Sequence, residues 1–324
     1  MKILAVDDDP IILELMVEIF RSFGAHTLVT CQSGAEAIDI ARQDPTIQCF
    51  LLDIQMPAMN GIELCRRLRG IPAYTRTPIL MITAMTEKHY VDAAFSSGAT
   101  DYISKPFDIS ELRGRISLID GLVSDRARTD DAMGRMRLPK VEAARDRLAA
   151  LRAPFEIHDV PGLIDESALE NYLMRLSRSA LFGSSVTAFA IHHVQQHFNS
   201  LSLFDFQSLV VDVAEALSDS MGARQFLMAY LGNGIFGCVS EDGAMRDTES
   251  FLRSVQTVLH HMDLHSSDGT PLRVQICAGK SIRLVWRSGQ SAVEALAECY
   301  NSAGEAADRI DPALDKVWFL ERSA

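Results

Sequence analysis

The first third of the chain repeats one pattern, in which a short apolar run ends in a polar residue and a helical periodicity follows. The polar residues at these ends are Asp7, Asp53, Thr83 and Lys105. Helices between successive strands predict a parallel sheet, because each crossover helix returns the chain to the same edge. The five repeats predict an α/β fold over residues 1–122, a doubly wound five-stranded parallel sheet. Since parallel strands end at one edge, we expect the four polar side chains to converge there.

Composition and charge narrow the classes of function. The chain has 324 residues, enough for two or three domains of about 100–200 residues each. Its formal net charge of -12 and the lack of a helix-turn-helix pattern disfavour DNA binding, which needs a concentrated basic surface. The six cysteines form no Cys-x-x-Cys pair, which favours a reducing compartment. No apolar run approaches the roughly 18–20 residues of a membrane span, so we expect a cytoplasmic protein.

Further motifs follow one another in order along the first domain. They are Asp7-Asp8, Asp53 with Met56-Pro57 and Asn60-Gly61, Thr83-Ala84, Gly98-Ala99, Tyr102, and Lys105-Pro106-Phe107. Together they span the whole domain and resemble the receiver domain of two-component response regulators. This resemblance implies a flavodoxin-like fold and a phosphorylated aspartate.

The residue types at the strand ends suit phosphoryl transfer. Such transfer needs an oxygen nucleophile and groups that stabilise charge on the transferring oxygens. Asp53 is the expected nucleophile and phosphoacceptor, and a histidine kinase or a phosphotransfer protein is the expected donor. Lys105 is expected to pair with the phosphoryl oxygens as a point charge, and Thr83 to form a hydrogen bond with another oxygen.

The resemblance also implies a metal ion and a switch. Mg²⁺ is the expected cofactor, because a few carboxylates together with water and phosphate oxygens suit its octahedral shell. Its expected protein ligands are Asp7, Asp8, Asp53 and the backbone carbonyl of Gln55. Tyr102 resembles the switch aromatic of the family, which turns inward as Thr83 moves to the phosphate.

Residues 123–158 differ in character from the first domain. They begin with a charged stretch, and an apolar stripe at Val141, Ala144, Leu148 and Leu151 then suggests a helix that ends by Pro154. This linker is either a solvated spacer or a helix that carries changes in the receiver to the output, for example through homodimerisation.

Residues 159–324 predict one α+β domain with the strand and helix order βαββαβ, which is ferredoxin-like and typical of nucleotidyl cyclases. We expect a helix over 166–180, a strand over 185–191 and a last strand near 317–320. A hairpin should pair 225–230 with 235–240, since Asn233-Gly234 is a strong turn signal.

The order and spacing of this second domain resemble the GGDEF domain of diguanylate cyclases. The motif falls on Gly232, Asn233, Gly234, Ile235 and Phe236, where only the first glycine and the phenylalanine match. Ala190 stands where the family has a metal-binding aspartate, and Ala223 and Phe226 stand at the inhibitory product site. The Lys-x-x-Asn-Asp motif of the family falls on Gln195, Gln196, His197, Phe198 and Asn199.

The loss of these residues predicts a degenerate, catalytically inactive cyclase domain. Condensing two GTP molecules requires metal ions on the triphosphate, and neither carboxylate that would hold them is present. We therefore expect a response regulator that is phosphorylated on Asp53 and signals by binding a downstream protein. The alternatives are an active diguanylate cyclase and a nucleotide-binding sensor controlled by the receiver.

Overall fold

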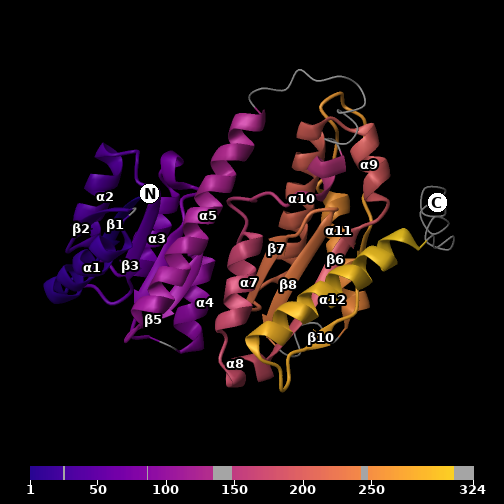
Figure 1. Ribbon diagram of the computed structural model, residues 1–324. Coiled ribbons are helices and arrows are strands. Elements are labelled where there is room, and N and C mark those ends of the chain that lie inside the picture. The colour runs from indigo at the N-terminus through magenta and orange to yellow at the C-terminus, as the bar shows by residue number, and fades with distance from the viewer. Residues whose placement is uncertain (25, 86, 134–147, 242–246, 310–324) are drawn as a thin grey trace, which may run out of the picture. The chain divides into compact units, whose positions relative to one another are not determined.

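The computed structural model describes residues 1–324 except 25, 86, 134–147, 242–246 and 310–324 (Figure 1). The chain divides into two compact units. The first comprises Met1–Ala143 and Glu170–Arg175, and the second comprises Ala144–Leu169 and Leu176–Ala324. The strand expected near 317–320 and the linker residues Val141 and Ala144 lie outside the described residues.

The first unit contains the predicted five-stranded parallel sheet, which is flavodoxin-like. Its strands are β1 (Lys2–Val6), β2 (Thr27–Cys31), β3 (Cys49–Asp53), β4 (Ile79–Thr83) and β5 (Asp101–Ser104). They lie in the order β2-β1-β3-β4-β5, and every neighbouring pair is parallel. The strand order reverses at β1, so the carboxyl ends of β1 and β3 flank the point where such sheets bind ligands.

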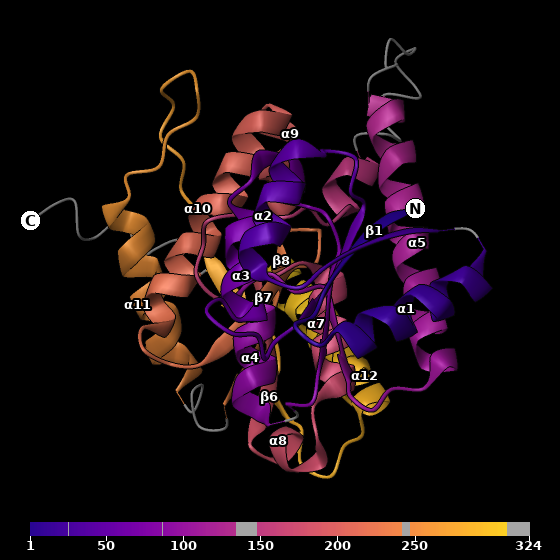
Figure 2. The same ribbon diagram turned by 90° about the vertical axis from the view of Figure 1, so that its left-hand side faces the viewer.

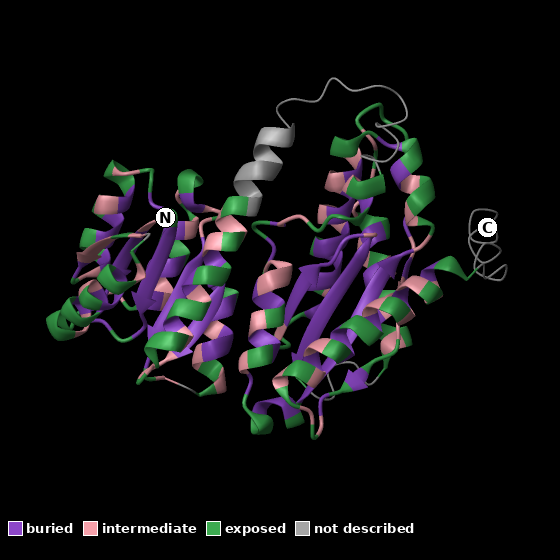
Figure 3. Cartoon of the chain, in the orientation of Figure 1, coloured by how far each residue is buried: buried purple, intermediate pink, exposed green. Residues whose placement is uncertain are grey.

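Helices cover both faces of this sheet, which buries β3 and β4 completely and leaves the edge strand β2 only partly buried (Figure 3). They are α1 (Pro10–Phe23), α2 (Gly34–Gln43), α3 (Gly61–Arg69), α4 (Lys88–Ser96) and α5 (Ile109–Met133), with a short 3₁₀ turn at Pro72–Tyr74. Helices α1 and α5 lie on one face, and α2, α3 and α4 lie on the other (Figure 2). Alternate strand residues such as Ile3, Ala5, Leu80 and Ile82 pack under α1 and α5, as a period of two requires.

Residues Glu170–Arg175 of α7 (Glu166–Arg175) also belong to the first unit. The Tyr172 hydroxyl donates a hydrogen bond of 2.7 Å to the buried carboxylate of Asp92. Burial raises the pKa of Asp101 to about 6, and Arg115 donates a hydrogen bond of 2.9 Å to this side chain. The buried carboxylates of Asp92 and Asp101 therefore each accept a hydrogen bond from a nearby side chain.

The second unit is an α+β domain with an antiparallel sheet. Its strands are β6 (Ser184–Ile191), β7 (Phe226–Tyr230), β8 (Ile235–Glu241), β9 (Ile276–Ala278) and β10 (Ile282–Arg283). The order is β10-β6-β8-β7, with β9 also paired to β6, and all these pairs are antiparallel. The helices are α8 (Arg178–Phe182), α9 (Val194–Ser200), α10 (Leu203–Met221), α11 (Thr248–His261) and α12 (Gly289–Asp308).

The helix expected over 166–180 is two helices, α7 and α8. Ser177 interrupts it, because its side chain accepts the Ala180 backbone N–H at 3.3 Å and so caps a new helix. The apolar periodicity continues through this break, which is why the pattern alone did not reveal it.

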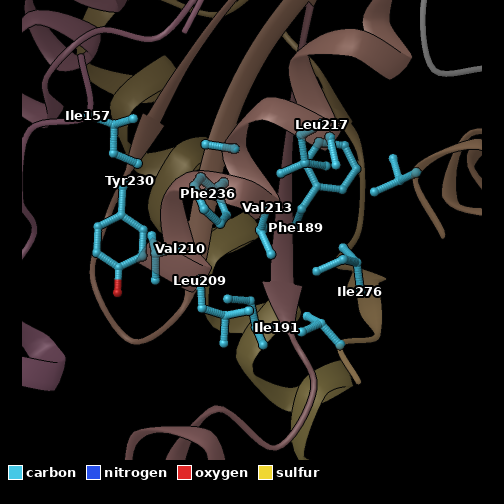
Figure 4. Packing of buried hydrophobic residues seen from close by; sticks show 14 of the residues in the cluster. Ile157, Phe189, Ile191, Leu209, Val210, Val213, Leu217, Tyr230, Phe236 and Ile276 are labelled. Atoms are coloured by element: carbon cyan, nitrogen blue, oxygen red, sulfur yellow. The ribbon is translucent and has the colours of Figure 1, made fainter. Parts of the chain in front are cut away.

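Two layers of helix pack on the antiparallel sheet. One layer contributes Leu209, Val210, Val213 and Leu217 of α10 to a cluster with strand residues such as Phe189 and Phe236 (Figure 4). On the other side, α12 packs through small residues, and the Cys299 thiol donates to the Val186 carbonyl at 3.4 Å. Leu151 and Ile157, from the expected linker, are also buried in the first of these layers.

The different burial of Leu148 and Leu151 gives the first prediction. Leu151 is 2% exposed and Leu148 is 41% exposed, although both lie on the apolar stripe of the linker. We expect Leu151→Ala to lower the free energy of unfolding of the second unit by about 2–5 kcal/mol, through lost burial and a cavity. Leu148→Ala should change it by less than about 0.5 kcal/mol. Urea denaturation of the full chain measures both, and equal effects would contradict the burial of residue 151.

Candidate functional site

Three charged side chains meet at the carboxyl edge of the parallel sheet. Lys105 Nζ donates hydrogen bonds to Asp7 Oδ2 at 2.6 Å and to Asp53 Oδ1 at 2.7 Å. Asp7 is 1% exposed and Asp53 is 5% exposed. Two buried carboxylates therefore share one ammonium group, and the cluster keeps an excess of negative charge.

The ends of three strands position this cluster. Asp53 is the last residue of β3, and Asp7 directly follows β1. The Asp9 backbone N–H donates to Asp7 Oδ1 at 3.0 Å, so the turn into α1 fixes the Asp7 carboxylate. Lys105 follows β5, and its backbone N–H donates to the Thr83 carbonyl at 2.7 Å. The parallel register thus brings together residues that are far apart in the sequence.

Burial and hydrogen bonding set the charge states of the cluster. Burial raises the pKa of Asp53 above its ordinary value, although the hydrogen bond from Lys105 acts in the opposite direction. Burial alone would lower the pKa of Lys105, but its hydrogen bonds to Asp53 and Asp7 outweigh burial and raise that pKa. Lys105 therefore remains a cation at neutral pH.

Thr83 and Tyr102 form hydrogen bonds with the same residue, Met85. The Thr83 hydroxyl is buried and accepts the backbone N–H of Met85 at 3.2 Å. The Tyr102 hydroxyl donates to the carbonyl of Met85, and burial raises the pKa of Tyr102 to about 12. Met85 is thus a shared partner that sequence reasoning missed, because its contribution comes from backbone groups that every residue type carries.

The expected metal ligands are oxygen donors of the kind that Mg²⁺ prefers. Asp7 and Asp53 are buried at the strand ends, whereas Asp8 and Gln55 are exposed beside them. Over the described residues, no three His, Cys, Asp or Glu side chains are grouped closely enough to hold a metal ion. The chemistry of the donor set and the excess negative charge fit a hard cation.

Gly61 is a second residue whose role the sequence did not reveal. It begins α3 next to the end of β3, and a Cβ on Gly61 would lie 2.1 Å from the Asp53 carbonyl oxygen. The preceding Asn60 caps the helix by accepting the Glu63 N–H at 2.9 Å. The Asn-Gly pair was visible in the sequence, but the close approach of the two backbones was not.

The residues of the expected cyclase motif lie on the β7–β8 hairpin. Gly232, Asn233 and Gly234 form the turn, and Ile235 and Phe236 begin β8 and are buried. Ala190 of β6 is 1% exposed and pairs with Ile235. The other expected motif positions are Gln195, Gln196, His197, Phe198 and Asn199 on α9, Ala223 after α10, and Phe226 at the start of β7.

Comparison with known proteins identifies the first domain. The model of a family described as response regulator receiver domain matches residues 3–117. The N-terminal part of this chain is a response regulator receiver domain. The match does not extend to the C-terminal domain, whose family these comparisons do not identify. The receiver assignment means that this part of the chain acts in two-component signalling.

Two curated proteins agree with this assignment. The chain is 40% identical over 116 residues to the DNA-binding response regulator MtrA of Mycolicibacterium smegmatis, covering 36% of this chain and 48% of MtrA. It is 33% identical over 112 residues to the signal transduction histidine-protein kinase BarA of Escherichia coli, covering 35% of this chain and 12% of BarA. A putative response regulator from Chloroflexus aurantiacus is a solved structure with 33% identity and a TM-score of 0.35, covering 36% of this chain and 95% of that one. The chain thus spans about half the length of MtrA, and much less of BarA.

No helix in the described part of the chain is long and apolar enough to cross a membrane.

The contact between Gly61 and Asp53 gives the second prediction. In Gly61→Ala the new methyl group would collide with the backbone of β3, so we expect the receiver to lose about 1–3 kcal/mol of unfolding free energy. Gly114→Ala is the matched control, since Gly114 lies in α5 with open space around its Cα. That variant should gain about 0.5–1 kcal/mol, because alanine favours a helix over glycine. Urea denaturation distinguishes the two, and an unchanged Gly61→Ala would contradict the close approach.

Proposed function

We propose that this chain is a two-component response regulator that accepts a phosphoryl group on Asp53 and signals through a C-terminal domain that is not a catalyst. The observation that carries this proposal is the buried Asp7–Lys105–Asp53 cluster at the carboxyl edge of a receiver sheet. The donor would be a histidine kinase or a phosphotransfer protein, and the reaction would take place in the cytoplasm.

The proposed reaction forms an acyl phosphate. A carboxylate oxygen of Asp53 attacks the phosphorus of a phosphohistidine, an O–P bond forms, the N–P bond breaks, and the released imidazole takes up a proton from water. Lys105, which already contacts Asp53, is placed to pair with the phosphoryl oxygens. Mg²⁺, held by Asp7, Asp8, Asp53 and the Gln55 carbonyl, would neutralise negative charge on those oxygens.

Met85, which forms hydrogen bonds with both Thr83 and Tyr102, supports a way in which phosphorylation could change the position of Tyr102. The incoming phosphoryl group brings about -1.5 to -2 charges and three strong acceptors. The Thr83 hydroxyl would turn from the Met85 N–H and donate a hydrogen bond to one of these oxygens. Met85 would then lose one of its two partners, and the remaining bond from Tyr102 would move with the loop.

The third prediction tests the acceptor. Beryllofluoride with Mg²⁺ mimics the phosphoryl group, and we expect it to shift the amide NMR signals of Thr83, Met85 and Tyr102 in the parent chain. Asp53→Asn should show no such shift, since the amide lacks the anionic oxygen that holds the ligand. Asp39→Asn is the control, because Asp39 is an exposed carboxylate on α2. A response of Asp53→Asn equal to that of the parent would show that another residue is the acceptor.

The packing at the hairpin supports an output domain without cyclase activity. The strand order β10-β6-β8-β7 and its antiparallel pairs are those of a ferredoxin-like βαββαβ domain, as in nucleotidyl cyclases. Yet a Cβ on Gly234 would lie 2.6 Å from Val194 Cγ2, so this position has no room for an acidic side chain. Ile235 and Ala190 are apolar and buried where a cyclase has its carboxylates. We therefore propose a degenerate GGDEF-like domain that acts by binding a downstream protein.

The fourth prediction separates this proposal from its alternatives. The full chain, activated with beryllofluoride and incubated with GTP and Mg²⁺, should form no cyclic di-GMP, because no carboxylate holds the metal ions. An active diguanylate cyclase run in parallel is the positive control. Accumulation of cyclic di-GMP would establish the enzyme instead. Heat released on titration with GTP or cyclic di-GMP, without turnover, would establish a nucleotide sensor.

A further inference from the structure

The turn of the β7–β8 hairpin has a left-handed backbone. Gly232, Asn233 and Gly234 all have left-handed conformations, with φ of 79°, 52° and 68°. Such a run is uncommon outside glycine, and asparagine is among the residues that tolerate it best. Left-handed residues at Asn233 and Gly234 are what a tight two-residue hairpin turn requires, so the contacts of the turn, and not its backbone, indicate a further role.

One side of the turn contacts a helical segment near the start of the second unit. Residues 148–152 are helical, and the last carbonyls of a helix have no partner within it. The Asn233 backbone N–H donates to the Leu151 carbonyl at 2.8 Å and so satisfies one of them. Gly232 lies against the next carbonyl, because an added Cβ would be 2.1 Å from the Arg152 oxygen.

Side chains on both sides of this contact strengthen it. The ring of Phe155 packs on Tyr230 of β7, with ring centroids 4.8 Å apart. Leu151 is buried in the core of the second unit, as is Ile157. The end of the expected linker therefore packs as part of the output domain, and the β7–β8 turn is one of the surfaces that it contacts.

The other side of the turn contacts the rest of the domain. Asn233 Nδ2 donates to the Tyr300 hydroxyl on α12 at 2.7 Å. The Gly234 N–H donates to the Tyr230 hydroxyl at 3.1 Å, and the Gly234 carbonyl accepts the Ile191 N–H of β6 at 2.9 Å. A displacement of residues 148–152 would thus act through one turn on α12, β7 and β6.

We propose that the β7–β8 turn is the joint through which the segment at residues 148–155 transmits the state of the receiver to the output domain. The turn at Gly232, Asn233 and Gly234 lies where a cyclase would bind its nucleotide. In this chain the turn binds residues 148–155 of the linker instead. This inference rests on the proposed function, in which phosphorylation of Asp53 is the input. It adds the route by which that input reaches α12 and the sheet.

Hydrogen exchange on the full chain, with and without beryllofluoride and Mg²⁺, tests the joint. In the parent, beryllofluoride should change the exchange of receiver peptides and also of peptides from the β7–β8 turn and from α12 around Tyr300. In Gly232→Ala the methyl group displaces the Arg152 carbonyl. Exchange of residues 148–155 should then rise by about tenfold, the factor that corresponds to one lost hydrogen bond. Beryllofluoride should still act on the receiver but no longer on the turn or on α12.

Gly269→Ala is the matched control for the backbone. Gly269 has φ of 82°, close to that of Gly232, but an added Cβ would meet nothing within 4 Å. Both variants carry the same left-handed strain, and only Gly232→Ala also carries the collision, so Gly269→Ala should behave as the parent. Tyr300→Phe is a milder second variant that removes only the hydroxyl that accepts from Asn233, and it should weaken the response of α12.

The possible outcomes distinguish a failure of the proposed transmission through the β7–β8 turn from a failure of the proposed phosphorylation. A receiver that does not respond to beryllofluoride in the parent overturns the proposed function. A receiver that responds while the turn and α12 do not change overturns the joint alone. The joint is also overturned if Gly232→Ala transmits the response as well as Gly269→Ala does, or if its residues 148–155 exchange as slowly as in the parent.

Discussion

The sharing of one ammonium group by two buried carboxylates is the interaction on which the receiver depends. Lys105 holds Asp7 and Asp53 at 2.6 and 2.7 Å, and these residues come from the ends of three different strands. Removing two carboxylates from water without a counter-charge would be costly, so the lysine makes their burial feasible. It leaves an excess negative charge, which suits a cation.

The second unit has a different constraint, which is tight packing around a turn. Glycines at positions 232 and 234 have a backbone carbonyl and a valine side chain where a Cβ would be. No acidic residue fits at Gly234, and the neighbouring strand positions are buried and apolar. The contact of Gly234 is with Val194, whereas Gly232 and Asn233 contact Arg152 and Leu151, so one turn packs closely on both sides.

The sequence predicted the parallel sheet because apolar strands, polar strand ends and helical periods all recur with the same alternation. It predicted for the same reason that Asp7, Asp53 and Lys105 would lie together, since strand register sets their positions. It could not predict contributions from backbone groups, such as those of Met85, or a close backbone approach such as that of Gly61 to Asp53. The sequence also did not predict the different burial of Leu148 and Leu151, because both fit one helical stripe and only tertiary packing distinguishes them.

Direct mapping of the phosphoryl group tests the central claim most sharply. The full chain would be incubated with acetyl phosphate and Mg²⁺, reduced with borohydride, which converts an aspartyl phosphate to homoserine, and analysed by peptide mass spectrometry. The account predicts homoserine at position 53 and at no other aspartate, because it assigns Asp53 at the end of β3 as the acceptor and Asp7, which is buried beside the same lysine, as a metal ligand. Homoserine at Asp7 or Asp8 with none at position 53 would contradict it.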